Sequence, residues 1–125
     1  MKTKTAVLHP VSTKVPFILN IGLNVGDAEP KDQLEKTIKA CGGVSFVTDG
    51  GYIENGEIKK ERTAVVWVVL EQEEAQGYAV RLCKELKQDM IPVFNIRTQT
   101  GEIYYNPEYK GEKVTFDKEL FQFRA

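Results

Sequence analysis

The sequence TAVVWVVL, residues 63–70, decides the fold because it is apolar on both of the faces that alternate along a strand. Val65 and Trp67 would point to one face of a sheet, and Val66 and Val68 to the other. A strand that is apolar on both faces is buried on both faces. The stretch therefore predicts a central strand with a layer of structure packed on each side.

A hairpin leads into this strand from the N-terminal side. Asn55-Gly56 is the strongest short hairpin signal in the chain, because both residue types tolerate the positive φ angles of a two-residue turn. Residues 44–53 before the turn are expected to form the partner strand, with a break at residues 49–51, Asp-Gly-Gly. The charged residues 57–61 after the turn begin the returning strand.

Two helices and two further strands flank the hairpin. Residues 17–25, FILNIGLNV, alternate between two faces and predict the first strand. Residues 27–41 and 71–89 have the three- and four-residue apolar spacing of helices. Residues 90–98 predict a fourth strand, in which Pro92 indicates a sheet edge. The expected inner stripes of the two helices are Leu34, Ile38 and Cys41, and then Ala75, Ala79, Leu82 and Leu86.

The order strand–helix–strand–strand–helix–strand most simply gives an α+β, ferredoxin-like fold. In that fold an antiparallel sheet carries both helices on one face, and its first and third strands are central. We expect an N-terminal arm at 1–14, a ferredoxin-like core at 15–100 and an aromatic C-terminal β extension at 101–125. Within the extension, residues 102–105 and 113–116 are expected to pair as a late hairpin.

The face of the sheet without helices also needs a cover, because a large exposed apolar patch is rare on a monomer. We therefore expect a homo-oligomer, a dimer or larger, that associates through the sheet faces with help from the C-terminal extension. The alternative is a monomer whose extension alone covers the sheet.

Composition excludes several classes of protein. Lys plus Arg (17) nearly balances Asp plus Glu (18) in 125 residues, so there is no bulk positive charge of the kind that general nucleic-acid binding needs. No apolar run is long enough to span a membrane, and the N-terminus has no secretory h-region. Cys41 and Cys83 fall within predicted helices, so a disulfide framework is not expected and a cytoplasmic location is. One histidine and two distant cysteines cannot build a conventional zinc site, and we expect no cofactor.

Residues 44–70 carry an ordered set of turn residues, namely Asp49, Gly51, Gly56 and Glu61, before the apolar strand. In this order, and in Ile21-Gly22-Leu23 before the first helix, the chain resembles a family of small bacterial proteins of unknown function. That resemblance implies a ferredoxin-like fold and dimerisation of the dimeric α+β-barrel type. It implies no established activity. Members of that family often carry a secretion signal, and this chain departs from them there.

The first candidate site combines an aromatic ring, amides and a guanidinium group. Asn20 and Asn24 lie on the polar face of the first strand, and Asn95 and Arg97 share a face of the fourth. These strands are neighbours in the expected fold, and Trp67 would lie beside them. Such a set suits a ring-bearing anionic ligand, because the ring stacks on Trp67 while Arg97 holds a phosphate or carboxylate. The alternative is that the amides form a buried network and Arg97 is a surface residue.

Two more charged residues qualify as candidates. Arg62 enters the apolar strand and would reach a ligand at the end of the sheet, although charged hairpin residues usually only protect an edge. Glu61 is the one acid that we would test as a general base. Cys41 and Cys83 have core-like positions, and His9 has no obvious partner, so nucleophilic catalysis is not expected.

The sequence thus favours a non-catalytic, oligomeric binding protein that senses or sequesters a small anionic, nucleotide-like ligand. A phage protein that captures a host signal nucleotide would fit this description. One alternative is a small dimeric α+β-barrel enzyme that acts on a carbonyl substrate through Glu61, Arg62 or Arg97. Another is a protein-binding adaptor that acts through the aromatic extension.

Overall fold

The computed structural model describes residues 13–113, 115–117 and 122–124. The predicted N-terminal arm therefore lies outside the described residues apart from Thr13 and Lys14. The elements, in chain order, are β1 Lys14–Gly22, α1 Pro30–Cys41, β2 Phe46–Glu54, β3 Glu57–Glu71, the short 3₁₀ helix η1 Gln72–Glu74, α2 Ala75–Glu85, β4 Met90–Asn95, β5 Thr100–Tyr105, β6 Thr115–Asp117 and β7 Gln122–Arg124.

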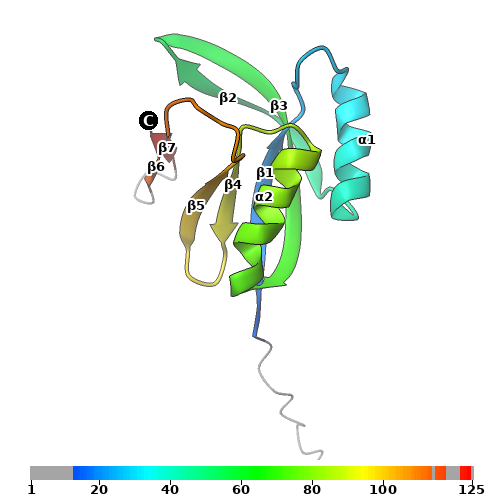
Figure 1. Ribbon diagram of the computed structural model, residues 1–125, viewed down its shortest axis with the longest axis vertical. Helices are drawn as coiled ribbons and strands as arrows, with labels where there is room; N and C mark the ends of the chain where they lie inside the picture. Colours follow the sequence, from blue (N-terminus) through cyan, green and yellow to red (C-terminus); the bar gives the residue numbers. More distant parts are fainter. Residues whose placement is uncertain (1–12, 114, 118–121, 125) are drawn as a thin grey trace, which may run out of the picture.

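Five of the strands form one antiparallel sheet in the order β2-β3-β1-β4-β5 (Figure 1). The first and third strands are central, as the sequence predicts, and the α+β fold class is confirmed. The sheet has one strand more than the four-stranded arrangement that was expected, because β5 adds to the edge at β4. Both helices pack on the same face of this sheet (Figure 1).

Two expectations about the edge of the sheet are wrong. Residues 102–105 pair with β4 and not with residues 113–116, and β6 pairs with β7 in a separate two-stranded sheet. β4 is also not an edge strand, although it contains Pro92. The ladder between β4 and β1 is only three residues long, from Val93 to Asn95, so Pro92 lies outside it. A residue without a backbone N–H is tolerated where no ladder bond is required.

The register between β1 and β3 assigns the two faces of the sheet. Leu19 lies opposite Val66 on the face that the helices cover, and Ile18 lies opposite Trp67 on the other face. The hydrophobic core is on the helix side, where Leu19, Ile21, Val66, Leu82 and Ile91 are almost completely buried. β3 is apolar on both faces, as the sequence shows, but only its helix side is buried, because Trp67 and Val69 are 55 and 59% exposed. The layer expected on the second face stays a prediction.

The two helices bury different kinds of residue. α2 buries its predicted stripe, Ala75, Ala79 and Leu82, followed by Leu86. α1 does not bury its predicted stripe: Gln33 and Thr37 are buried, and Ile38 is 42% exposed. These two polar side chains are satisfied inside, because the amide of Gln33 donates to the backbone oxygen of Leu86 and the hydroxyl of Thr37 donates to that of Gln33.

The hairpin between β2 and β3 forms at the predicted turn. Asn55 and Gly56 have φ angles of 52° and 79°, the left-handed values of a type I′ turn. The expected break at residues 49–51 does not occur, because β2 runs through it as a continuous strand. β1 pairs with β3 only as far as the pair Gly22–Thr63, so residues 50–62 form a two-stranded ribbon that extends beyond the rest of the sheet (Figure 1).

Candidate functional site

The face of the sheet that points away from α1 and α2, called here the open face, carries large exposed apolar side chains. Phe46, Trp67 and Val69 have exposed fractions of 54, 55 and 59%. Around them the open face comprises Pro16, Ile18, Asn20, Thr48, Thr63, Val65, Pro92 and Phe94. An apolar surface of this kind favours a ligand or another protein as its cover.

Asn20 and Trp67 lie next to each other on the open face. Ile18 pairs with Trp67 and Asn20 pairs with Val65, so Asn20 and Trp67 are diagonal neighbours across two hydrogen-bonded strands. Side chains at diagonal positions are within reach of each other when one of them is large. The structure therefore brings together the amide and the aromatic ring that the sequence places in one site.

Glu61 lies further along the same face, over the end of β1. A side chain at position 22 would collide with Oε1 of Glu61, so the absence of a side chain on Gly22 makes room for this carboxyl group. Within the described residues the Glu61 carboxyl has no hydrogen-bond or ion-pair partner, and it is half-buried. Burial raises the pKa of Glu61 above that of a free glutamate. A half-buried, unpaired carboxyl group is available to a ligand.

The backbone around Glu61 is held by amide side chains. Gln88 is only 7% exposed and bonds to both backbone groups of Gly22, accepting from its N–H and donating to its oxygen, each at 2.9 Å. Asn24 accepts a hydrogen bond of 3.2 Å from the backbone N–H of Arg62. The end of β1 is thus fixed on both sides of the Glu61 carboxyl group.

Arg62 itself is exposed and weakly held. Its Nε atom lies 3.9 Å from Oδ1 of Asp49, and both side chains are mostly solvent-accessible. An exposed pair at this distance contributes little to stability. Because side chains alternate along β3, the guanidinium group lies with Asp49 on the face opposite to that of Glu61 and Trp67.

The remaining two predicted site residues lie elsewhere. Asn95 pairs with Phe17 and is buried on the helix side of the sheet, where its Oδ1 atom accepts from the N–H of Thr98. Arg97 lies at the opposite end of β1 and donates a 2.8 Å hydrogen bond to the backbone oxygen of Lys14. Lys14 and Gly22 are eight residues apart along one strand, roughly 27 Å at the usual rise. The structure brings Asn20 and Trp67 together on the open face and places Asn24 at the end of β1. It turns the side chain of Arg62 to the other face, and it separates Asn95 and Arg97 from this strip.

Sequence reasoning noted Gly22 only in the turn before the first helix and missed its contact with Glu61, and it did not single out Gln88 at all. A glycine inside a strand often marks a close approach of another group, and this was the available signal for Gly22. Gln88 follows α2 in a connecting segment, where no periodic pattern singles it out. Its role depends on a contact across 66 residues of sequence.

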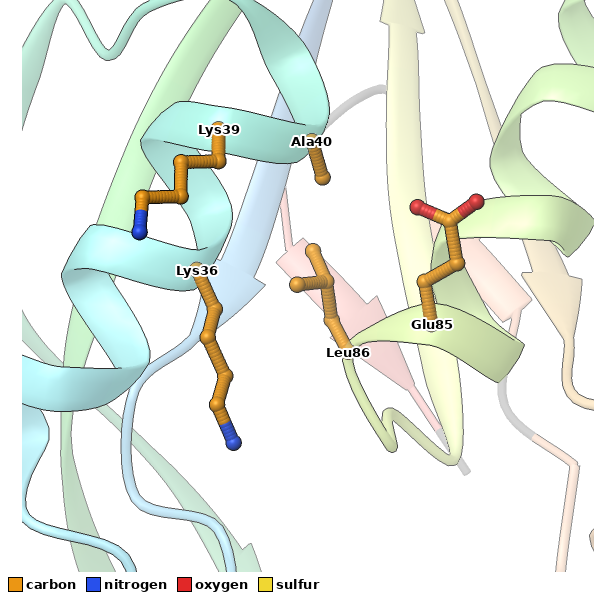
Figure 2. Close-up of a pocket in the computed structure, with 5 residues that line it drawn as sticks. All are labelled: Lys36, Lys39, Ala40, Glu85 and Leu86. Carbon is orange, nitrogen blue, oxygen red and sulfur yellow. The ribbon is translucent and has the colours of Figure 1, made fainter.

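The helix layer contains a separate open cavity of about 340 Å³ between α1 and the end of α2. Figure 2 shows Leu86 pointing from the end of α2 toward Ala40 of α1, with Lys36 and Lys39 on one side and Glu85 on the other. None of the residues predicted for the site lines this cavity. It lies on the opposite side of the sheet from the strip between Trp67 and Glu61.

Nucleophilic, metal and membrane sites find no support in the described residues. Burial raises the pKa of Cys83 to about 11 and also raises that of Cys41, which disfavours reactive thiolates at both positions. Among the residues that the structure describes there is no group of three side chains suited to hold a metal ion. No helix in the described parts of the chain is long and apolar enough to cross a membrane.

Comparison with known proteins gives two structural neighbours. No protein-family model matches the chain, and no curated protein matches it in sequence. A phage SAM lyase in complex with S-methyl-5'-thioadenosine superimposes with a TM-score of 0.57 and 16% identity, over 84% of this chain and all of the lyase. A phage SAM lyase in its apo state gives a TM-score of 0.52 and 18% identity over the same shares. At these identities the likeness shows the fold.

Proposed function

We propose that the protein binds a small nucleoside-like molecule of the methylthioadenosine type on the open face, along the strip from Trp67 to Glu61. The observation that carries the proposal is the juxtaposition on one face of an exposed aromatic ring, a neighbouring amide and an unpaired carboxyl group. The proposal is also supported by the fold that the chain shares with a phage SAM lyase whose structure holds methylthioadenosine.

Each part of the strip suits one part of such a ligand. The ring of Trp67 offers a stacking surface for a purine, and the amide of Asn20 can hydrogen-bond to its polar edge. The Glu61 carboxylate can accept hydrogen bonds from ribose hydroxyls, and Gly22 leaves the strand backbone open beside it. Asn24 borders this end of the strip, where its side-chain oxygen accepts from the backbone N–H of Arg62.

The unpaired carboxyl group also bears on the charge of the ligand. The sequence predicts an anionic ligand held by arginine, but Arg97 lies at the far end of β1 and Arg62 stands next to Glu61. A phosphate at Glu61 would be repelled by a carboxylate, whereas a neutral nucleoside or a sulfonium cation would not. We therefore propose a nucleoside without a phosphate, of neutral or positive charge.

Calorimetry with three ligands tests this proposal. Methylthioadenosine and S-adenosylmethionine (SAM) should bind, and adenosine monophosphate should bind at least tenfold more weakly. Trp67→Ala should weaken binding by about 1–3 kcal/mol, the range for base–aromatic stacking. Arg97→Ala is the matched control and should leave the affinity unchanged. Equal affinity in the Trp67→Ala variant would place the ligand elsewhere, and a loss in Arg97→Ala would favour the anionic site predicted from the sequence.

We also propose that copies of the chain associate through the open face. The support is the exposure of Phe46, Trp67 and Val69 together, on a sheet face that no helix covers. Light scattering at micromolar concentration should give a mass that is a multiple of 14.1 kDa. A species of single-chain mass alone would contradict this part of the proposal.

Catalysis is a second candidate function, favoured by the raised pKa of the unpaired Glu61 carboxyl. In this case the bond between the sulfur of SAM and its aminobutyrate chain would break with the electron pair going to sulfur, so that methylthioadenosine, the molecule held by the neighbouring lyase, leaves. The aminobutyrate fragment would balance the step by losing a proton to Glu61 as it forms a carbon–carbon double bond. Chromatography of SAM incubated with the protein distinguishes the two functions. Tight binding with no methylthioadenosine formed supports sequestration. Product that forms with the native chain and not with Glu61→Gln supports catalysis.

A further inference from the structure

β2 is an edge strand of the five-stranded sheet, because among the described strands only β3 pairs with it. A strand edge presents a row of backbone N–H and C=O groups that can pair with another chain, and proteins commonly block it with lysine, proline or a bulge. β2 contains neither lysine nor proline, and its ladder to β3 runs without a bulge over all nine of its residues. Its Asp49 carboxylate faces Arg62 on the neighbouring strand. The outer edge of β2 is therefore open to a further strand.

The hydrogen-bond pattern identifies the backbone groups that point outward from β2. The N–H of Leu23 donates to the backbone oxygen of Arg62 at 2.8 Å, so the backbone groups of Arg62 face β1. Backbone groups of successive residues in a strand point to opposite sides, so those of Glu61 face its partner Gly50 in β2. The outward groups consequently belong to the odd-numbered residues of β2, namely Val47, Asp49, Gly51 and Ile53. No described residue bonds to these groups.

The outer half of the hairpin also lacks a third strand. β1 pairs with β3 only as far as Gly22 and Thr63, which leaves residues 50–62 as the two-stranded ribbon that extends beyond the sheet (Figure 1). A two-stranded ribbon is marginally stable by itself in water, and a third strand stabilises it. Ile53 and Ile58 are opposite each other in this ribbon and are 76 and 73% exposed. A further strand beside β2 would complete the ribbon and cover part of Ile53.

We propose that the free edge of β2 pairs with the same edge of a second copy of the chain, antiparallel and centred on Gly50. Outward groups must meet outward groups, so odd-numbered residues of one copy pair with odd-numbered residues of the other. Centring the pair on Gly50 places Val47 opposite the partner's Ile53, two apolar side chains on the same face. It also places Asp49 opposite the partner's Gly51, so the two Asp49 carboxylates do not meet.

The neighbouring registers are less favourable. Centring the pair on Asp49 would set its carboxylate directly against that of the second copy, and like charges at this position are destabilising. Centring it on Gly51 would set Asp49 against the partner's Ile53, which offers a carboxylate no polar partner. The sequence of β2 is thus complementary to itself in one register, which is the requirement for a two-fold interface.

The edge interface does not compete with the proposed ligand strip. A two-fold axis through Gly50, perpendicular to the sheet, joins two five-stranded sheets side by side and keeps both open faces on the same side. The partner's β2 becomes the third strand of each ribbon. Trp67 and Glu61 lie on the open face and stay accessible. This interface is therefore distinct from the association through the open face that is proposed above.

Disulfide cross-linking of the full-length chain tests the register. Gly50→Cys places two thiols opposite each other at a pair without hydrogen bonds, where the Cα atoms are about 4.5 Å apart and within disulfide range. A side chain there first meets the hydroxyl of Thr63, at 3.2 Å, so a small shift accommodates it. Thr48→Cys is the matched control, because the two copies of position 48 are roughly 13 Å apart along the strands. Both variants carry Cys41→Ser, which removes the half-exposed native thiol. Mild oxidation should give at least tenfold more covalent dimer with Gly50→Cys.

Two lysine substitutions in the Gly50→Cys chain test the edge itself. Ile53→Lys places a charge on the outer strand, where lysine opposes the addition of another strand, and should lower the yield of covalent dimer at least tenfold. Ile58→Lys is its control, because Ile58 is as exposed as Ile53 but lies on β3, away from the outer edge. Its yield should stay within twofold. Cross-linking that persists with Trp67→Ala supports an interface separate from the open face.

Amide hydrogen exchange of the native chain gives an answer without any substitution. The N–H of Gly50 faces β3 and should be protected at every concentration. The N–H of Gly51 faces outward and should become protected as the concentration rises, because only the pair supplies its acceptor, the partner's Asp49 oxygen. A Gly51 amide that exchanges at the unfolded rate even at millimolar concentration overturns the proposal. Equal cross-linking of Gly50→Cys and Thr48→Cys overturns it as well.

Discussion

The carboxyl group of Glu61 lies in the space that a side chain on Gly22 would occupy. The two residues are not opposite each other in the register, because Gly22 pairs with Thr63, and Glu61 is the next residue of β3 on the same face. Any substitution at position 22 must therefore move an acid that we place in the ligand site. A substitution at Gly22 is therefore expected to change both the stability of the fold and the position of Glu61 in the proposed ligand site.

Gly22→Ala is expected to lower the free energy of unfolding by about 1–3 kcal/mol, the usual cost of overpacking. The added carbon also approaches Oε1 of Gln88 at 3.3 Å, so the amide that holds the strand end must shift as well. Denaturant unfolding measures the loss. Gly77→Ala is the control, because nothing lies within 4 Å of a side chain there and alanine favours the helix by about 0.5–1 kcal/mol. A Gly22→Ala variant as stable as the native chain would show that Glu61 is not packed over the strand end.

The pH dependence of stability should report on Glu61 directly. Its pKa in the folded state is raised by burial, so the folded protein binds its proton more tightly than the unfolded chain does. Stability is thus lost as the pH rises from the unfolded pKa through the folded one, and then stays constant. Glu61→Gln mimics the neutral acid at every pH. Its stability advantage over the native chain should appear as the pH rises above 4.5, the ordinary pKa of a glutamate, and then level off, as followed by melting temperature. An advantage that is largest at low pH would contradict a raised pKa.

The fold could be predicted from the sequence because its signals are local. The alternation of residues 17–25 and the turn at Asn55-Gly56 each act over a few residues, and both appear in the structure as expected. The predicted inner stripe of α1 was wrong because the apolar spacing of a helix does not show where its buried polar side chains find partners. Its apolar spacing favoured Ile38, but buried hydrogen bonds of Gln33 and Thr37 to distant or helical oxygens decide which face turns inward.

The site was predicted in part because the face of a strand is visible only when its pattern is one-sided. The first strand has one polar face, which places Asn20 on the open face with Trp67. The fourth strand, MIPVFN, is apolar on both faces, so its pattern does not show which one meets the helices. The pairing of Phe17 with Asn95 decides this, and it turns Asn95 inward. The contact between Gly22 and Glu61 depends likewise on the register of distant strands.

Val66 and Trp67 are neighbours in the chain and should respond oppositely to substitution. Val66 is 1% exposed in the core, so Val66→Asp buries an unpaired charge and should cost about 4 kcal/mol or more. Trp67 lies on the open face with 55% of its surface exposed, so Trp67→Ala should cost the isolated chain far less. Its effect should appear in ligand affinity and in the mass measured by light scattering. Equal losses of melting temperature for the two variants would contradict the assignment of the faces.

Gln88 tests whether the strand end is held independently of the ligand. Its amide accepts from the N–H of Gly22 and donates to the oxygens of Gly22 and Leu86, at 2.9, 2.9 and 3.2 Å. Gln88→Ala leaves these buried backbone groups without partners and should cost about 1–3 kcal/mol. Gln88→Glu keeps the acceptor and sets its second oxygen against two carbonyl oxygens, so the protein with the ionised glutamate should also be destabilised.

Asn24→Ala is the control for stability, because its single bond to Arg62 is exposed and contributes about 0.5–1.5 kcal/mol. Denaturant unfolding and calorimetry with methylthioadenosine should show a larger stability loss for Gln88→Ala than for Asn24→Ala, together with weaker binding because Glu61 is displaced. Full stability in Gln88→Ala would mean that the amide does not fix the strand end, and unchanged affinity in a destabilised Gln88→Ala would separate Glu61 from the ligand.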